Sequence, residues 1–459
     1  MAKPNDSKFH VAMFPWFAFG HMTPFLYLSN ELAKRGHRIS FLLPNKAQHQ
    51  LKPTNHHPDL ITFHPLAVPA VDGLPKGTET ASDIPIFLTT HLATAMDLTR
   101  HQVESILIDL KPDFVFYDTA HWIPELASTI GFKTVCYNAV CAASLATAVV
   151  PARKVFKDRQ LTTEELAAPP PGYPSTTVVL RQHEARALSF ISFEFGSGIT
   201  FYDRVKTAME KCNAISIRTC HEVEGELCNY IGTQFAKPVF LTGPVLPEPD
   251  KNPVEHRWER WLDQFEPGSV VFCAFGSQWV LEKAQFQELV LGFESTGLPF
   301  LVAVKPPTGA TTVEEALPEG FEERVRERGV VCRWVQQPQI LGHKSVGCFV
   351  NHCGFGSMWE ALMSESQIVL VPHLGDQILN TRLLADELKV AVEVERDENG
   401  LFSKENLCKA VKSVMDKDSE VGGLVRKNHE KWRKTLMSKG FMSGYIDGFI
   451  EKLHELKCQ

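Results

Sequence analysis

The residues between Trp334 and Gln377 offer the groups that a nucleotide and a sugar require. Trp334 presents a flat ring on which a base can stack. Gln337 and Glu360 carry amide and carboxylate groups that can bind sugar hydroxyls, and the Asp376–Gln377 pair can hold a further polar head group. We therefore predict that this stretch binds a nucleotide linked to a sugar.

A turn in the middle of this stretch is suited to phosphate. The apolar run 346–350 is typical of a buried parallel strand, and residues 357–363 are typical of the start of a helix. The turn between them, His352–Ser357, contains Gly354 and Gly356, so backbone N–H groups of a helix N-terminus can point at a diphosphate. A glycine turn alone is a weak signal, but the surrounding groups make the combination specific.

A second candidate site for chemistry lies near the start of the chain. His21 follows an apolar run that ends at Pro15, and Asp118 follows the apolar run 113–117. A neutral imidazole, with a reference pKa of roughly 6.5, can take a proton from a hydroxyl. A carboxylate on its other nitrogen would hold the ring and stabilise the imidazolium. We expect His21 to be a general base and Asp118 its partner; the alternative is a histidine that only satisfies loop groups.

The elements that position these residues alternate between strand and helix. In the first half, Thr23 is expected to cap a helix with Pro24 at its first position, after a loop over 17–21. The carboxyl ends of parallel strands meet at one edge, where ligands of such sheets bind. The expected strands are 9–14, 38–43, 113–117, 134–137, 214–218 and 240–244, followed in the second half by 270–275, 300–304, 346–350 and 390–394.

This alternation, interrupted once, predicts an α/β fold of two doubly wound, Rossmann-like domains that face a cleft. The interruption is a segment rich in proline and acidic residues. We expect an acceptor-binding domain over 1–246, a linker over 247–256, and a nucleotide-sugar-binding domain over 257–440. A final helix over 441–459 is expected to pack back on the first domain.

Composition limits the partners and the compartment. The 459 residues are 44% hydrophobic and 22% charged, as in ordinary globular proteins, and the formal net charge is −7. An acidic chain without basic clusters argues against nucleic acid or an anionic membrane as partner. Its 11 cysteines, without a C-x-x-C pair, fit reduced thiols. No uninterrupted apolar stretch suits a spanning helix or signal peptide, so we expect a cytoplasmic protein without stable membrane insertion, and a monomer.

Other chemistries lack their motifs. His221-Glu222 is not followed by the second histidine of a zinc protease, and no nucleophile elbow, Walker loop or dinucleotide turn is present. Helix N–H groups and His352 can carry the charge of a leaving diphosphate, so we expect no metal and no cofactor. Ser277, after the strand expected at 270–275, is a further candidate for the diphosphate; the alternative is an ordinary turn.

The stretch from Trp334 to Gln377 resembles the signature box of the plant UDP-sugar-dependent glycosyltransferases, and the resemblance extends over nearly the whole chain. It implies the GT-B fold, a UDP-sugar as co-substrate, and His21 and Asp118 as the catalytic pair. Phe355 replaces the family's usual Trp, and Gly356 replaces its usual Asn, for which a backbone N–H can substitute. The donor-binding residues that the resemblance implies are Ser277, Trp334, Val335, Gln337, His352, Gly354, Phe355, Gly356, Ser357, Glu360, Asp376 and Gln377.

The Phe-Gly variant, with Phe14-Pro15-Trp16 near the start, is similar to the branch that extends a sugar already attached to a flavonoid. We therefore expect inverting transfer from a UDP-sugar to a flavonoid or anthocyanin 3-O-glycoside, at the 2″ hydroxyl or alternatively at 6″. Transfer to aglycones or terpenoid glycosides, and a non-catalytic nucleotide-sugar binding protein, are the rival interpretations. Glucose, rhamnose, xylose and galactose remain open as the donor sugar.

Overall fold

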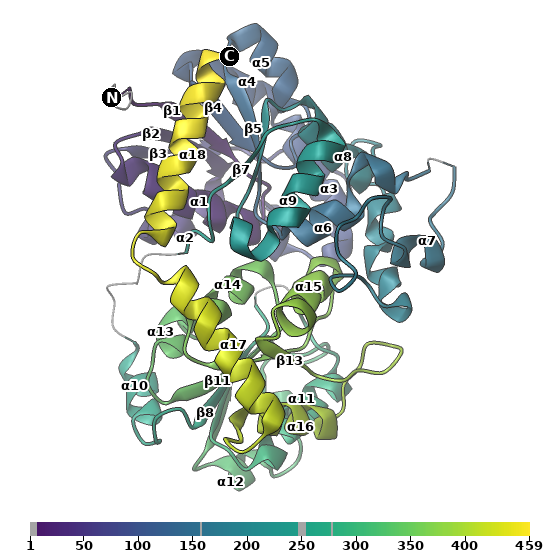
Figure 1. Ribbon diagram of the computed structural model, residues 1–459, viewed down its shortest axis with the longest axis vertical. Helices are drawn as coiled ribbons and strands as arrows, with labels where there is room; N and C mark the ends of the chain where they lie inside the picture. The colour runs from purple at the N-terminus through teal and green to yellow at the C-terminus, as the bar shows by residue number, and fades with distance from the viewer. Residues whose placement is uncertain (1–6, 157, 247–253, 277–278) are drawn as a thin grey trace. The chain divides into compact units, whose positions relative to one another are not determined.

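The computed structural model describes residues 7–156, 158–246, 254–276 and 279–459. The chain forms two compact units (Figure 1). The first comprises Met1–Ser175, Ala185–Leu246 and Gly440–Gln459, and the second comprises Thr176–Glu184 and Pro247–Lys439. The segment Thr176–Glu184 was expected to belong to the domain over 1–246, but it packs with the second unit. Residues 247–253 of the expected linker lie outside the described residues.

The first unit is built on a parallel sheet with the strand order β3-β2-β1-β4-β5-β6-β7. The apolar runs form its strands because both faces of the sheet are covered by helices. The strands are β1 (His10–Phe14), β2 (Arg38–Pro44), β3 (Ile61–Leu66), β4 (Phe114–Tyr117), β5 (Lys133–Asn138), β6 (Ala214–Ile217) and β7 (Val239–Leu241). The helices are α1 (Phe19–Lys34), α2 (Asn45–Leu51), α3 (Thr89–Leu98), α4 (Arg100–Leu110), α5 (Ile123–Ile130), α6 (Ala142–Ala148), α7 (Thr163–Ala167), α8 (Phe201–Lys211) and α9 (His221–Phe235).

The last helix, α18 (Phe441–Cys458), lies along this sheet and is drawn in yellow in Figure 1. Its apolar side chains belong to the same core as β1 and β4. The ring of Phe449 meets Phe116 edge-on at 5.9 Å and Phe240 at 6.3 Å between centroids. Phe449 and Leu453 are four residues apart, so they lie on the same face of α18, and both are buried. This apolar face explains why the end of the chain packs on the first unit.

The second unit has a parallel sheet of order β10-β9-β8-β11-β12-β13. Its strands are β8 (Val270–Ala274), β9 (Phe300–Ala303), β10 (Gly329–Cys332), β11 (Val346–Asn351), β12 (Gln367–Leu370) and β13 (Ala391–Glu393). Its helices are α10 (His256–Leu262), α11 (Lys283–Thr296), α12 (Phe321–Val325), α13 (Gln337–Leu341), α14 (Phe355–Met363), α15 (Gly375–Thr381), the π-helical η7 (Arg382–Glu387), α16 (Lys404–Met415) and α17 (Glu420–Leu436). Both sheets are thus all-parallel and doubly wound, as the sequence predicts.

Helix α1 begins earlier than predicted. Its N-cap is Ala18, so the expected loop over 17–21 is largely helical and Pro24 lies inside the helix. The carbonyl of Ala18 accepts hydrogen bonds from the N–H groups of His21 and Met22, both at 2.9 Å, and starts the helix before the proline. A proline this close to the N-terminus removes only one intrahelical hydrogen bond, so the earlier turn survives. His21 is consequently a residue of the first helical turn.

Candidate functional site

The register of the first sheet brings His21 and Asp118 together. Strand β1 pairs with β4, with Phe14 opposite Tyr117, so the chain leaves both strands at the same edge. Nδ1 of His21 lies 2.7 Å from Oδ2 of Asp118. Because a carboxylate only accepts, Nδ1 carries the proton and Nε2 is the ring nitrogen that can accept one. The side chain of His21 is 28% exposed, so this nitrogen belongs to a group that solvent and ligands can reach.

The other oxygen of Asp118 is held by the backbone. Oδ1 accepts the N–H of Trp16 at 2.8 Å and the N–H of Thr119 at 2.5 Å. The side chain of Asp118 is only 4% exposed, so few competing water contacts remain. The carboxylate is therefore oriented by two peptide groups before His21 binds to it, which is the arrangement that preorganises a histidine base.

Aromatic rings surround the start of α1. Trp16 and Phe17 are stacked, with interplanar angle 7°, and both are buried. Phe14 and Trp122, whose rings lie 5.6 Å apart, are buried as well. These four rings are core. Two other rings of this unit, Phe190 and Phe193, are exposed by 36% and 47%.

In the second unit, His352 directly follows β11. Asn351 forms the turn by accepting the N–H of Cys353 at 2.8 Å, and Cys353 adopts the left-handed φ of 56°. The imidazole lies against two glycines: a Cβ on Gly354 would come within 2.6 Å of Nε2, and one on Gly276 within 2.9 Å of Cε1. Within the described part of the chain Nδ1 is buried and has no hydrogen-bond partner. The ring is therefore fixed by contact and retains a polar atom for a ligand.

His352 is a neutral donor or acceptor at cellular pH. Burial, followed by the charge of His373, lowers the pKa of His352 to about 4. Helix α14 begins beside it with Gly354 as N-cap. The N–H groups of Gly356 and Ser357 lie in its first turn, where no intrahelical acceptor is available. An anion here would thus be met by helix N–H groups and their dipole, and by a neutral imidazole.

The two departures from the family pattern have different surroundings. Phe355 is only 6% exposed and packs its ring against Trp359 at 6.1 Å between centroids, so its side chain is part of the core. A Cβ added at Gly356 would meet nothing within 4 Å, so open space lies beside this position. Val335 is also buried.

Folding also gathers the polar residues expected to bind ribose. Nε2 of Gln337 donates to Oε2 of Glu360 at 2.6 Å and approaches Oγ of Ser357 at 3.4 Å. Trp334, just after β10, is 64% exposed, which is high for a tryptophan and suits a stacking platform. Ser277 lies outside the described residues.

Gln377 is partly occupied. Its Oε1 accepts the N–H groups of His373 and Leu374 at 3.0 and 3.2 Å, which caps α15. Only its NH₂ group is left to donate to a ligand. Asp376 lies beside it in the first turn of the same helix.

Sequence reasoning missed a stack of rings near His352. The indole of Trp279 stacks on His373 at 4.5 Å and 12°, and on Phe275 at 4.6 Å and 28°. Phe275 follows β8 and His373 comes soon after β12, and β11 lies between these strands. Positions after strand ends were a usable signal, but the strand order that unites them is not apparent from the sequence.

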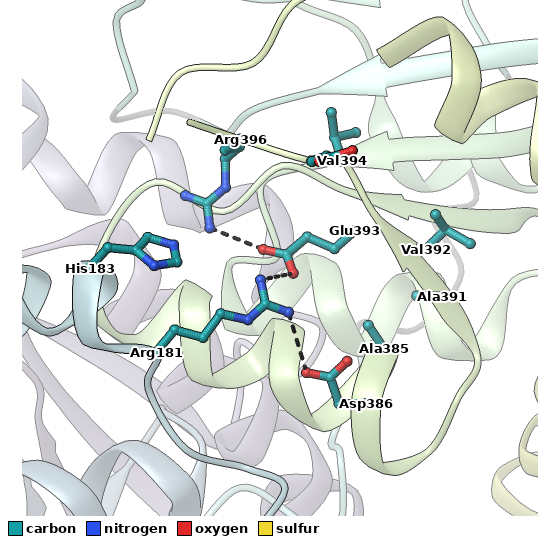
Figure 2. A pocket seen from close by; sticks show the side chains of 10 residues that line it. Arg181, His183, Ala385, Asp386, Ala391, Val392, Glu393, Val394 and Arg396 are labelled. Carbon is teal, nitrogen blue, oxygen red and sulfur yellow. Dashed lines mark hydrogen bonds and ion pairs between the residues drawn. The ribbon is translucent and has the colours of Figure 1, made fainter. Parts of the chain in front are cut away.

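A charged cavity of about 410 Å³ lies against β13 and η7 (Figure 2). Figure 2 shows Arg181 and Arg396 reaching the carboxylate of Glu393 from two sides, at 3.3 and 3.0 Å. Arg181 also lies 3.9 Å from Asp386. Although burial alone would raise it, the neighbouring arginines, chiefly Arg382, lower the pKa of Glu393. Glu393 therefore remains ionised and paired with arginine side chains.

Arg382 is the centre of this charged cluster. Its side chain is 2% exposed and bonds Glu184 at 2.5 Å, Glu393 at 2.6 Å and Asp386 at 3.0 Å. Glu184 comes from the segment Thr176–Glu184, which explains why this segment packs with the second unit. Arg382 also directly follows α15, so the cluster anchors the far end of the helix that begins with Asp376 and Gln377.

Two features are absent from the described residues. None of their helices is long and apolar enough to cross a membrane. Nor do three or more of their His, Cys, Asp and Glu side chains group as metal ligands. None of the eleven cysteines, all of which lie in the described part of the chain, is joined in a disulfide.

The two all-parallel, Rossmann-like units have the GT-B fold. Residues 312–429 match the family model "UDP-glucoronosyl and UDP-glucosyl transferase". The chain is 59% identical over 458 residues to the anthocyanidin 3-O-glucoside 2'''-O-xylosyltransferase of Arabidopsis thaliana, covering 98% of both chains. It is 57% identical to UDP-glycosyltransferase 79B6 of Arabidopsis thaliana, again over 98% of both. The chain therefore belongs to the plant family 1 UDP-glycosyltransferases and is an enzyme of that family.

Solved structures share the fold at lower identity. Glycyrrhiza uralensis UGT73P12 complexed with glycyrrhetinic acid 3-O-monoglucuronide superposes with a TM-score of 0.79 at 20% identity, covering 99% of this chain and 97% of that one. Arabidopsis thaliana UGT89C1 complexed with UDP-L-rhamnose gives a TM-score of 0.75 at 23% identity, covering 98% and 100%.

Proposed function

We propose that this enzyme transfers a sugar from a UDP-sugar to the 2-hydroxyl of the first sugar on a flavonoid or anthocyanin 3-O-glycoside. The observation that carries the proposal is the 59% identity, over 98% of both chains, to a relative named for transfer of xylose to an anthocyanidin 3-O-glucoside. An identity of 59% supports the reaction class more strongly than it supports the identity of the donor sugar. UDP-xylose is therefore the first donor to test, and a UDP-hexose is the alternative.

The mechanism assigned here is a single displacement. Nε2 of His21 takes the proton of the acceptor hydroxyl as its oxygen attacks the anomeric carbon. The bond from that carbon to the diphosphate breaks on the opposite face, and UDP leaves with the electron pair, so configuration inverts. The imidazolium that forms on His21 is stabilised by Asp118 at 2.7 Å.

The remaining residues hold the donor in this proposal. Trp334 stacks on uracil, and Gln337 with Glu360 binds the ribose. The N-terminus of α14 and His352 receive the negative charge that develops on the diphosphate. Asp376 and the NH₂ group of Gln377 bind the transferred sugar. Since these groups already stabilise the negative charge of the leaving group, we propose that no metal is required; activity retained after EDTA treatment would support this.

The decisive experiment compares acceptors with and without the first sugar. Quercetin 3-O-glucoside and quercetin, and the corresponding cyanidin pair, are each assayed with UDP-xylose, UDP-glucose, UDP-rhamnose and UDP-galactose. A site that hydrogen-bonds the first sugar rejects an aglycone by about 10⁴-fold, because its polar groups are left unpaired. We expect kcat/KM to favour the glucosides strongly and NMR of the product to show a 1→2 linkage. An equal or higher kcat/KM on the aglycones would contradict the proposal.

The eleven free thiols also favour a reducing compartment, so we propose a cytoplasmic location. A fluorescent fusion imaged in plant cells tests it.

A further inference from the structure

The first unit also contains a buried ion pair, Arg204 with Asp97, which is connected to the His21–Asp118 pair through Thr119. Arg204, on α8, is fully buried and faces Asp97, near the end of α3. The pair is bidentate: Nη1 lies 2.9 Å from Oδ1 and Nη2 lies 2.6 Å from Oδ2. Burial alone would raise the pKa of Asp97, but its bonds to Arg204 lower it, so the carboxylate stays charged. Such a pair is costly to bury and needs further hydrogen bonds.

Those further bonds go to peptide carbonyls. Nε of Arg204 donates to the carbonyl of Phe195 at 2.7 Å, and Nη2 to that of Gly196 at 3.2 Å. Nη1 donates to the carbonyl of Thr119 at 3.3 Å. One guanidinium therefore fixes two backbone segments, the residues after Asp118 and the loop that precedes α8.

The first of these segments leads directly to the catalytic pair. Thr119 accepts from Arg204 through its carbonyl and donates its own N–H to Oδ1 of Asp118 at 2.5 Å. Arg204 thus holds the peptide group after Thr119, and the N–H that orients the carboxylate belongs to the peptide group before it. A shift of Arg204 would be passed through the backbone of Thr119 to Oδ1 of Asp118, whose Oδ2 binds His21.

The second segment is connected to the same oxygen through Trp16. The ring of Phe195 packs on Trp16 at 5.2 Å between centroids, and the N–H of Trp16 donates to Oδ1 of Asp118 at 2.8 Å. Gly196 lies so close to α3 that a Cβ there would fall 2.7 Å from the Cβ of Ala93. The loop therefore has little freedom to move independently of Arg204.

Asp97 extends the contacts on the opposite side of the guanidinium. It accepts from the indole N–H of Trp122 at 3.0 Å and from Oγ of Ser197 at 2.6 Å. His121, whose pKa is lowered by burial and then by the charge of Arg204, lies 3.3 Å from Nη1 through its Nδ1. It is neutral at cellular pH and adds no second positive charge to the cluster.

We propose that Arg204 and Asp97 are positioning residues for general-base catalysis: both routes from Arg204 end on Oδ1 of Asp118, and so set the distance from Asp118 to His21. This inference rests on the catalytic roles proposed above. Displacement of a catalytic group by about 1 Å can cost about 10²-fold in rate. If the ion pair were purely structural, substitution of either residue would lower the stability of the enzyme and leave the rate of the folded enzyme unchanged.

The test uses Arg204→Lys and Asp97→Asn in the full-length enzyme. Arg153→Lys is the matched control, because Arg153 is also a buried arginine of the first unit, bonded to the carbonyls of Thr147, Glu165 and Ala168. We expect the two test variants to lose about 10- to 100-fold in kcat below their Tm, with UDP affinity unchanged. The control should change Tm only.

A second measurement does not depend on turnover. The rate at which diethyl pyrocarbonate modifies the imidazole of His21 is measured by mass spectrometry of the peptide that contains it. The Asp118→Asn variant shows how much this rate changes when His21 loses its carboxylate partner. We expect Arg204→Lys and Asp97→Asn to alter this rate in the same direction as Asp118→Asn, and Arg153→Lys to match the wild type. Wild-type values of both kcat and modification rate in the folded test variants would overturn the inference. An inactive wild-type enzyme with a normal modification series would instead contradict the proposed function. If Arg204→Lys fails to fold, the same two measurements on Asp97→Asn and on the milder Ser197→Ala, which removes one hydrogen bond to Asp97, test the inference.

Discussion

A Cβ added at Gly276 would lie 2.9 Å from Cε1 of His352, because the turn after β8 passes directly over the imidazole that follows β11. Gly276 also has a φ of 68°, which other residues adopt at a cost. We expect Gly276→Ala to displace His352 and weaken UDP binding by about tenfold or more, since a well-aligned charge-assisted hydrogen bond contributes roughly 1.5–3 kcal/mol. Calorimetry with UDP measures this.

Gly268→Ala is the matched control for that substitution. Its φ is 70°, so the backbone strain is the same, but nothing lies within 4 Å of the added Cβ. This variant should lose stability and keep its affinity for UDP. Equal losses of affinity in both variants would show that strain, and not the contact with His352, is responsible.

His21→Ala should lower kcat by about 10²–10⁴-fold, the contribution of a positioned general base. UDP affinity should change little, because the base is assigned to the acceptor and not to the donor. His101→Ala provides the control, since His101 is 94% exposed. Steady-state rates together with UDP calorimetry separate the two effects. A near-normal turnover in His21→Ala would remove this residue from the mechanism.

Trp334→Ala should weaken UDP by roughly 1–3 kcal/mol, the scale of one lost stack between a base and an aromatic ring. Because the ring is 64% exposed, its loss should leave Tm almost unchanged. Leu401→Ala, at a 52% exposed apolar side chain of the same unit, is the control. Unchanged calorimetric affinity for UDP in Trp334→Ala would refute the assignment of this residue to uracil.

The affinity for UDP-sugar should be nearly constant between pH 5.5 and pH 8. The pKa of His352 is lowered to about 4, so the ring is neutral throughout this range and acidification adds no charge to the site. The diphosphate of a UDP-sugar is fully ionised over the same range. Binding of UDP-glucose, measured without acceptor, checks this. A clear rise in affinity with a midpoint near pH 6.5 would mean that His352 binds the diphosphate as a cation.

The stability of the first unit should fall in acid because of His37. Burial, followed by the charges of Lys8 and His454, lowers the pKa of His37 to about 4, and its Nδ1 accepts the N–H of Phe9 at 3.0 Å. The unfolded chain takes up this proton near pH 6.5, so stability is lost as pH falls from there toward 4. At pH 5 the loss is about 2 kcal/mol from this residue.

The comparison of His37→Asn with the exposed control His101→Asn tests this linkage. His37→Asn should be less stable than the wild type at pH 7 but lose less Tm between pH 7 and pH 5. His101→Asn should follow the wild type at both pH values. If all three proteins lose the same Tm on acidification, the buried state of His37 is not linked to proton uptake on unfolding.

Much of the fold was predictable because it depends on local patterns. Short apolar runs bounded by glycine and proline indicate buried strands, and their alternation with amphipathic segments indicates parallel sheets. The strand that precedes His352 and the helix that follows it appear where the sequence places them. The start of α1 was wrong by five residues, because Pro24 is a familiar first helical residue and the stabilising turn at Ala18 is formed by backbone groups.

The sequence by itself determined the chemical inventory: a histidine after β1, an acid after β4, and the residues from Trp334 to Gln377. Only the tertiary structure decided which of these groups meet and how. The register of β1 against β4 sets the bond from His21 to Asp118, the strand order β8-β11-β12 unites Trp279 with His373, and Glu184 packs on Arg382 in the second unit. These pairings join residues about 100 to 200 positions apart. They depend on how whole elements pack, and no local pattern of residue types encodes that.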